Sequence, residues 1–559
     1  MANGSLPCLD YLTLAEEDLG KPVEFYIHAA LGPKHRFMSA YWKTLSHNGV
    51  NFPDQYQPEG LGITVWGSRV TLSPLAEEMA YQLAKKKDTP YVQDPVFVSN
   101  FMGDFVKQLP AWCREAKFAD VGFAELYRKV DAEKEAKEAM TKEQKKSLAA
   151  SRKERRESLK AKYGRATLDG KEVDIANWVV EPPGLFMGRG QHPFRGKWKP
   201  RVQASDVILN LGETAPVPPG DWRAVVHDHN SMWMAKWVDK LTGKEKYVWL
   251  HESSPLQQSR SKSKYDNARR VGANLQKIRA RILRDLDSKD GKVRQVATVC
   301  YLIDTLGMRV GDEKDEDEAD TVGASTLRVE HLSLKGNLAD FNFLGKDSVA
   351  WNKSETLPPA VARNLREFTT GKGPEDEIFH NVSSGQVNHF LSSIVPGLTA
   401  KVFRTYHATA RAKELLGSKN MKDSDDLDKL YHAKEANLQA AIFCNHQRTP
   451  PKTWEESLKK KRQRLDEARF KGDSKRIAKL QRELDFFTRT KNYNLNTSMK
   501  NYIDPRVVKS WCDYVGLDWA KVYSKSLQKK FSWVLQAAPK WEPETAAELK
   551  PLAAPRRQA

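Results

Sequence analysis

Four basic side chains lie among apolar or small residues, where a role in catalysis explains them better than a role in solubility. Arg309 lies between small and apolar neighbours in GMRVG, and Lys346 lies at the expected turn of an apolar hairpin. Arg404 lies in KVFRTY, and His446 follows the apolar segment AAIF. Two guanidiniums, an ammonium and an imidazole can surround a phosphodiester and stabilise its pentavalent transition state. A neutral nucleophile is then still needed, and a tyrosine hydroxyl qualifies because an aryl phosphodiester keeps the bond energy for resealing.

Each of these residues also has an ordinary structural explanation. A single arginine in an apolar context is more often part of an ion pair than a catalyst, and a lone histidine is more often a satisfied core residue. The common enzyme motifs offer no better candidate, because the sequence has no GxxxxGK[ST], HExxH or GxSxG. Leu344–Ser348 resembles the end of a phosphate-binding loop but lacks the upstream glycine. The acidic run 312–320 lacks the alternating ligands of a calcium loop and is interpreted as a solvated loop.

Length and cysteine content limit the class of protein. A chain of 559 residues is too long for one compact core, so two or three domains are expected. The cysteines are scattered without a CxxC pair, which argues against a zinc site or disulfide framework and fits a reducing compartment. They are Cys8, Cys113, Cys300, Cys444 and Cys512. No secretory signal and no apolar stretch of about 18 residues is recognisable, so no membrane partner is expected.

The net charge gives the first indication of a partner. Lys and Arg total 91 against 72 Asp and Glu, a formal net charge of +19. Such an excess favours a polyanion, and nucleic acid is the first candidate. A soluble basic protein with solvated, lysine-rich helices is the alternative on charge alone.

Two regions combine strong helix formers with many charges. Residues 128–165 predict two helices that project into solvent, and Thr141 with Gln144 predicts a capping box at the start of the second. Direct phosphate contact and a merely solvated charge run are both open for this region. Residues 454–491 carry two apolar stripes separated by a turn at 471–474, which predicts an antiparallel hairpin of amphipathic helices.

The remaining chain predicts a mixture of strands and helices. In chain order we expect antiparallel strands over 202–250, a polar Ser-rich hinge over 251–264, helices over 265–307, a hairpin over 340–351 with its turn at Gly345-Lys346, further helices to about Gln447, and a disordered Pro- and Ala-rich tail after 537.

Seven segments resemble, in order, the eukaryotic kind of type IB DNA topoisomerase. They are Glu181–Pro193, Met308–Lys314, Ala319–His331, Phe343–Ser348, Gly397–Ala408, Cys444–Lys452 and Asn501–Arg506. The resemblance extends over about 42–533, nearly the whole chain that is expected to fold. It implies an isomerase that relaxes positive and negative supercoils by transient single-strand cleavage, with no metal and no ATP or other cofactor.

The resemblance also implies a role for each catalytic residue. Tyr502 attacks the scissile phosphate and becomes linked to the 3′ end. Arg309 and Arg404 hold the non-bridging oxygens, and His446 donates a hydrogen bond to one of them. Lys346 is the general acid for the departing 5′ hydroxyl and also reaches a base edge. Further DNA contacts are expected from Arg189, His192, Asp347, Lys401, Gln447 and Asn501.

The implied fold is α+β and multidomain: a mixed cap lobe and a mainly helical catalytic lobe with a small hairpin sheet, which together clamp duplex DNA as a monomer. The expected divisions are an N-terminal segment 1–35, the cap 36–256 with its projecting helices at about 128–165, the catalytic core 257–453, the helical-hairpin linker 454–491, the nucleophile segment 492–536 and the tail 537–559.

The sequence departs from the family pattern at Met499, where the Ser-Lys-x-x-Tyr signature carries lysine; the catalytic groups are unaffected. The linker is short, and the charged N-terminal extension of cellular members is missing. An intracellular, DNA-containing compartment is therefore expected: a nucleus, or the factory or virion of a large DNA virus. The alternatives are a site-specific tyrosine recombinase, which usually carries His-x-x-Arg where this chain has Lys401-x-x-Arg404, and a non-catalytic DNA-binding protein.

Overall fold

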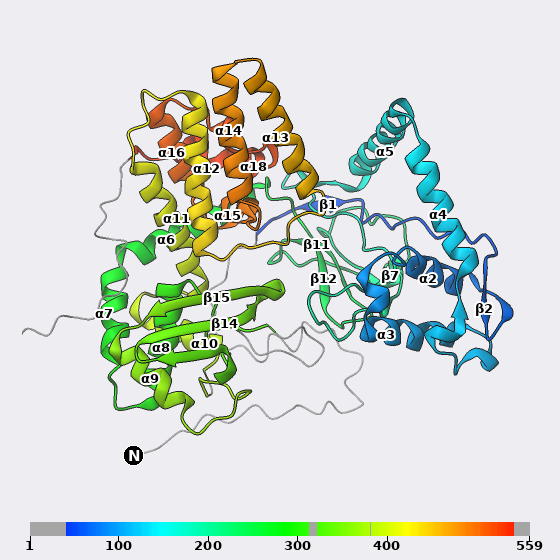
Figure 1. Cartoon of the computed structure of the whole chain (residues 1–559), viewed down its shortest axis with the longest axis horizontal. Coiled ribbons are helices and arrows are strands. Elements are labelled where there is room, and N and C mark those ends of the chain that lie inside the picture. The colour runs from blue at the N-terminus through cyan, green and yellow to red at the C-terminus, as the bar shows by residue number, and fades with distance from the viewer. Residues whose placement is uncertain (1–40, 312–320, 381, 542–559) are drawn as a thin grey trace, which may run out of the picture.

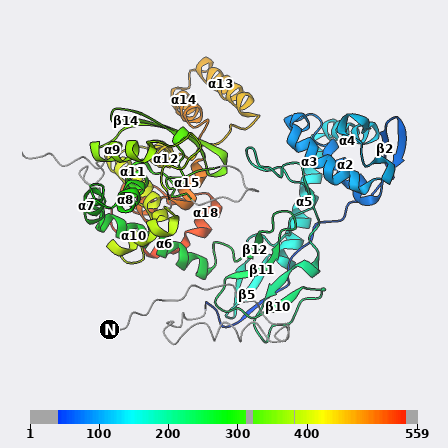
Figure 2. The ribbon, with the colours of Figure 1, turned by 90° about the horizontal axis from the view of Figure 1, so that it is seen from below.

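The computed structural model describes residues 41–311, 321–380 and 382–541. Their elements form two groups, one from residues up to about 250 and one from the rest, as both views show (Figure 1, Figure 2). Helices dominate and every sheet is small, so the predicted α+β class is confirmed. The predicted N-terminal segment 1–35, the acidic run 312–320 and the tail from 542 lie outside the described residues.

The first group contains two cores, each built around small sheets. One core joins the sheet β3-β2-β4 to the helices α2 and α3. The other joins β1-β5-β6 to β10-β9-β11-β12. The bounds of these elements are β1 Leu45–His47, β2 Gly62–Val65, β3 Ser68–Thr71, α2 Pro74–Ala84, α3 Pro95–Phe105, β4 Val121–Gly122, β5 Arg165–Leu168, β6 Lys171–Asp174, β7 Gly184–Leu185, β8 Trp198–Lys199, β9 Ile208–Asn210, β10 Ala224–Val226, β11 Trp233–Val238 and β12 Glu245–Trp249.

The two charged helices of this group are α4 (Ala124–Ala139) and α5 (Lys142–Tyr163). The predicted capping box is confirmed, because the Thr141 side chain accepts from Gln144 N and the Gln144 side chain accepts from Thr141 N. No residue of α5 is buried, and the pair projects from the rest of its group (Figure 1).

The predicted antiparallel strands over 202–250 are correct except for one pair. β11 pairs antiparallel with both β9 and β12, whereas β10 pairs parallel with β9. The long connection 211–223 contains three prolines and carries the chain back so that β10 runs in the same direction as β9. Parallel neighbours require such a crossover, whereas a tight hairpin would have made the pair antiparallel.

The predicted hinge over 251–264 is wrong beyond Ser254. Helix α6 (Pro255–Ala273) begins there, with the Ser254 hydroxyl accepting from Gln257 N and Pro255 in the first turn. A serine cap followed by proline is a strong helix start, and the polar residues that suggested a loop occupy the helix surface. Only the short link between β12 and α6 joins the two groups along the chain.

The second group contains a helical core around the sheet β13-β14-β15. The predicted hairpin is confirmed as β14 and β15, and β13 was not predicted. The elements are α7 Leu275–Asp285, α8 Gly291–Leu306, β13 Leu332–Lys335, β14 Leu338–Gly345, β15 Val349–Thr356, α9 Pro359–Thr369, α10 Ser384–Ile394, α11 Ala400–Gly417 and α12 Asp426–Phe443.

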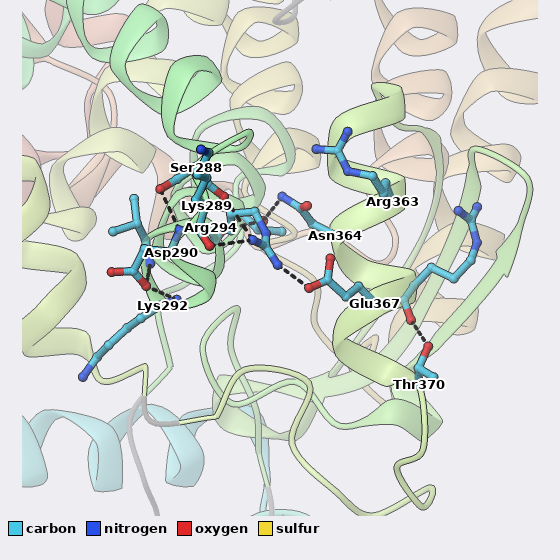
Figure 3. A network of polar contacts seen from close by, with 12 residues as sticks. Ser288, Lys289, Asp290, Lys292, Arg294, Arg363, Asn364, Glu367 and Thr370 are labelled. Carbon is cyan, nitrogen blue, oxygen red and sulfur yellow. Dashed lines mark hydrogen bonds and ion pairs between the residues drawn. The ribbon is translucent and has the colours of Figure 1, made fainter.

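A polar network fastens the start of α8 to α9 (Figure 3). Arg294 donates from Nη1 to Ser288 O at 3.0 Å and pairs through Nη2 with Glu367. Asn364, which is fully buried, donates to Leu286 O at 2.9 Å. These contacts satisfy main-chain carbonyls at the α7–α8 turn and so join that turn to α9.

The remaining helices complete the second group. The predicted helical hairpin is confirmed as α13 (Trp454–Phe470) and α14 (Ser474–Arg489), and the rings of Trp454 and Phe487 stack at 5.4 Å. The last helices are α15 Leu495–Asn501, α16 Pro505–Val515, α17 Trp519–Val522 and α18 Lys525–Lys530. They share a core with α6, α11 and α12. No helix among the described residues is both long and apolar enough to cross a bilayer.

Candidate active site

Tyr502 lies in the short link between α15 and α16, half-buried. Asp504 caps α16 and Pro505 begins it, so the helix must break at this link. Thr409 of α11 holds the link from both sides: its hydroxyl donates to Tyr502 O at 3.1 Å and accepts from Asp504 N at 3.0 Å. The backbone that carries the phenol is therefore fixed to α11.

Arg404 is the most constrained cation of the site. It lies on α11, is 5% exposed, and its guanidinium donates to the main-chain carbonyls of Gly307 and Cys444. Gly307 has a φ of +69°, and a Cβ there would meet the Phe443 ring at 2.9 Å, so this acceptor position requires glycine. The guanidinium lies over the Tyr502 ring, 5.4 Å from its centroid. Its Nε is buried without a partner among the described residues.

His446 follows α12 and faces the same tyrosine. The two ring centroids are 4.6 Å apart. His446 Nδ1 lies 2.6 Å from the hydroxyl of the fully buried Ser498 on α15. Nε2 is buried without a partner among the described residues. When the Ser498 hydroxyl donates to Nδ1, the neutral ring carries its proton on Nε2 and presents an N–H there. An unpartnered buried donor beside Tyr502 is a ready contact for an oxygen of a bound phosphate.

Burial, with the neighbouring charges of Arg404 and Arg309, lowers the pKa of His446 to about 3. The imidazole is therefore neutral at physiological pH. It serves as a hydrogen-bond donor rather than as a third full positive charge.

This pKa shift predicts how stability depends on pH. Between pH 6.5 and 3 the unfolded chain binds a proton at His446 and the folded chain does not, so the free energy of unfolding falls as pH falls. One such group contributes a slope of at most about 1.4 kcal/mol per pH unit. Urea unfolding at pH 7, 6 and 5 should therefore show a smaller decline for His446→Asn than for the parent chain.

Part of the decline should persist in that variant, because burial also lowers the pKa of His47 to about 4. An unchanged slope in His446→Asn would contradict the neutral buried imidazole.

Lys346 and Arg309 line the same cavity as Arg404 and His446, about 630 Å³ in volume. Lys346 lies on the turn between β14 and β15, where the next residue, Asp347, adopts a left-handed conformation at φ +67°. The turn thus directs an exposed ammonium into the cavity from the sheet. Arg309, also exposed, follows α8.

The first group of elements reaches this cavity through one loop. Arg189 forms an ion pair with Asp347, and both residues line the cavity. Gly190 has φ +58°, and a Cβ there would come within 2.3 Å of the Ser348 hydroxyl. The close approach of the two groups therefore requires glycine at this position.

The other predicted DNA contacts take different places. Gln447 lines the cavity and donates to Asn445 Oδ1 at 2.8 Å. Asn501 and Lys401 are exposed, on α15 and in the first turn of α11, and neither lines the cavity. His192 packs its ring 4.8 Å from Phe186, and its Nδ1 accepts from Phe194 N, so it shapes its own loop.

The sequence reasoning missed the residues that support this site. Ser498 makes a hydrogen bond with the His446 imidazole, and Thr409 fixes the tyrosine link. Asp304 binds His407 at 2.7 Å and Arg279 at 2.8 Å, which ties α11 to α7 and α8 one turn from Arg404. The sequence offered one indication of these supporting residues, the polar residue at position 498, four places before Tyr502 on a helix. The others depend on tertiary contacts.

Comparison with known proteins decides between the alternative families. The description "Eukaryotic DNA topoisomerase I, catalytic core" matches residues 253–484. The corresponding "DNA binding fragment" matches 40–250, and "C-terminal topoisomerase domain" matches 474–543. The chain belongs to the eukaryotic DNA topoisomerase I family. The predicted resemblance is thus confirmed across both groups of elements.

Individual members of the topoisomerase I family align over most of the chain. "DNA topoisomerase 1 beta" of Arabidopsis thaliana is 36% identical over 546 residues, which cover 89% of this chain and 59% of that protein. "DNA topoisomerase 1" of Homo sapiens is 35% identical over 547 residues, with 89% and 71% covered. That of Drosophila melanogaster is 36% identical, with 89% and 54% covered. The chain therefore spans little more than half the length of the plant and insect proteins.

Proposed function

We propose that this chain is a type IB DNA topoisomerase, which relaxes positive and negative supercoils by cutting and resealing one strand. The observation that carries the proposal is the arrangement around Tyr502. A half-buried phenol faces a guanidinium and a neutral imidazole, each with a buried nitrogen that has no partner among the described residues. Family membership supports the same reaction.

In the proposed reaction the Tyr502 oxygen attacks phosphorus, and the bond from phosphorus to the 5′ oxygen breaks. The tyrosine becomes linked to the 3′ end, its proton leaves to solvent, and Lys346 gives a proton to the 5′ oxygen. Arg309, Arg404 and His446 bind the non-bridging oxygens as negative charge develops on them. Resealing is the reverse attack by the 5′ hydroxyl, and neither step needs ATP or a metal.

The second part of the proposal concerns how DNA is held. The first group of elements is the cap and the second the catalytic lobe, and together they clamp duplex DNA as a monomer. The ion pair between Arg189 and Asp347 supports this, because it joins the groups at the cavity, far in sequence from the link before α6. Controlled rotation of the cut strand would then relieve torque. The compartment is one that contains DNA, either a nucleus or a viral factory or virion.

The DNA contacts outside the catalytic five are also part of the proposal. Arg189, Asp347 and Gln447 are supported by their place in the cavity, and Lys401 and Asn501 by their exposure near the tyrosine link. His192 would act through the shape of its loop.

One assay tests the proposed activity. Purified protein in EDTA, without ATP, should relax positively and negatively supercoiled plasmid through a ladder of intermediate topoisomers. Failure on both substrates, under conditions in which the protein binds DNA, would leave a non-catalytic DNA-binding protein. Recombinant products between plasmids that share one site would instead indicate a recombinase.

A further inference from the structure

Glu252 lies in the link between the two groups of elements. Before it, His251 N donates to Asp174 O at 2.8 Å, which anchors that end of the link to β6 of the cap. After it, Ser254 caps α6 of the catalytic lobe. Glu252 therefore lies between His251, which is bound to the cap, and Ser254, which caps a helix of the catalytic lobe. Any change in the angle between the lobes requires the main chain to move at this position.

The Glu252 carboxylate is bound by two lysines of the C-terminal segment. Oε2 lies 2.8 Å from Lys500 Nζ and Oε1 lies 2.9 Å from Lys530 Nζ. The carboxylate is 37% exposed, Lys500 is 38% exposed and Lys530 is 8% exposed. Half-buried pairs of this kind keep more of their attraction than fully solvated ones. Burial opposes ionisation of Glu252, but the two ammoniums outweigh it and hold the pKa of the carboxyl below its ordinary value.

Lys500 connects this ion pair to the nucleophile. It is the penultimate residue of α15, and Tyr502 is the C-cap of the same helix. Met499, which stands where the family signature has lysine, is 7% exposed and packs in the core shared with α12 and α16. The lysine thus stands one position later in this chain, and adjacent helical positions point in different directions. The shifted lysine reaches the lobe link instead of the core.

The other contacts that hold the tyrosine link come from the catalytic lobe itself. Lys264 of α6 donates to Asn501 O at 2.8 Å, and Thr409 of α11 donates to Tyr502 O. These contacts do not depend on where the cap lies. The contact from Lys500 to Glu252 does, because Glu252 precedes α6 and is next to the residue anchored on the cap.

We propose that Glu252 is a positioning residue that fixes α15, and with it Tyr502, to the link between the lobes, so that the nucleophile is held in place when the lobes are closed around DNA. The inference rests on the proposed function, since it requires Tyr502 to be the nucleophile. The inference gives Lys500 a role: through the Glu252 carboxylate it couples the position of the cap to the position of Tyr502.

The test is single-turnover cleavage of a duplex oligonucleotide whose short 5′ fragment dissociates after cleavage, with saturating enzyme so that binding does not limit the rate. Glu252→Gln and Lys500→Gln should each slow formation of the covalent complex by about threefold to fivefold, the upper part of the range for a partly exposed ion pair. The double variant should be no slower than the slower single variant, because both changes remove one interaction. Lys521 lies in the same C-terminal segment and pairs with Asp426 of α12, so Lys521→Gln removes an ion pair far from Glu252 in sequence and should cleave at the parent rate.

A charge exchange separates positioning from general support of the fold. In a Lys530→Gln background, where Lys530 cannot repel a lysine at position 252, Glu252→Lys combined with Lys500→Glu restores an ion pair and should cleave faster than Lys500→Glu alone. Loss of thermal stability without a change in cleavage rate would overturn the inference, as would losses that multiply in the double variant. If the parent chain itself forms no covalent complex, the proposed function fails. If the parent cleaves and Glu252→Gln cleaves equally fast, only this inference fails.

Discussion

Replacing Tyr502 with phenylalanine is expected to abolish both the covalent protein–DNA complex and plasmid relaxation, to below the limit of detection. The change removes one oxygen, the atom that would bond to phosphorus. The phenylalanine ring keeps its contacts with His446 and Arg404, and the Thr409 hydroxyl still binds the main chain of the link. The site should therefore keep its shape and its affinity for DNA.

The measurement is a plasmid relaxation assay with denaturing gel detection of the covalent complex, alongside DNA binding by the same preparations. Tyr514→Phe is the matched control, because Tyr514 is 44% exposed on α16 and lies outside the cavity. It should relax plasmid at the parent rate. Relaxation that persists in Tyr502→Phe would remove this residue from the mechanism.

Replacing Lys346 with alanine is expected to slow cleavage by about 10²–10⁴-fold, the usual contribution of a general acid. Lys346 is exposed on the turn after β14 and makes no hydrogen bond or ion pair among the described residues, so its loss should leave the fold intact. The defect should largely disappear on a substrate with sulfur at the bridging 5′ position, because a thiolate leaves without being protonated.

The comparison of the two substrates isolates proton transfer from phosphate binding. Lys335→Ala is a suitable control, since Lys335 is an exposed lysine at the opposite end of the same sheet, paired in register with Leu338. It should cleave both substrates at the parent rates. An equal defect of Lys346→Ala on the oxygen and sulfur substrates would contradict the general-acid role and leave Lys346 as a phosphate contact.

Local signals allowed several elements to be predicted from the sequence. The capping box at Thr141, the hairpin around Gly345-Lys346 and the helical hairpin over 454–491 depend on contacts between near neighbours in the chain, and all three are present. The link before α6 was predicted too long because Ser-rich composition outweighed the cap signal at Ser254. The parallel pair β9 and β10 was missed because strand direction depends on where a long connection travels.

The candidate site was predictable as a set of residue types but not as a geometry. The sequence motifs identified Arg404 and His446. No neighbouring residue in the sequence indicates that two main-chain carbonyls bind Arg404 or that Ser498 binds His446. Those partners lie 40 or more positions away in the sequence. The contact between Glu252 and Lys500 spans a still larger separation, so only the folded chain reveals it.

The guanidinium of Arg404 is bound by carbonyl oxygens and by no carboxylate among the described residues, so no described side chain neutralises its positive charge. Arg309 lies close enough to act, like Arg404, on the His446 imidazole, so its positive charge adds to that of Arg404. The folded protein without DNA therefore carries like-charge repulsion that a bound phosphate relieves. The same excess of positive charge therefore increases the affinity for a DNA phosphate and lowers the thermal stability of the protein alone. Any polyanion that binds at the site stabilises the fold, and above its Kd the gain in free energy of unfolding rises with the logarithm of its concentration.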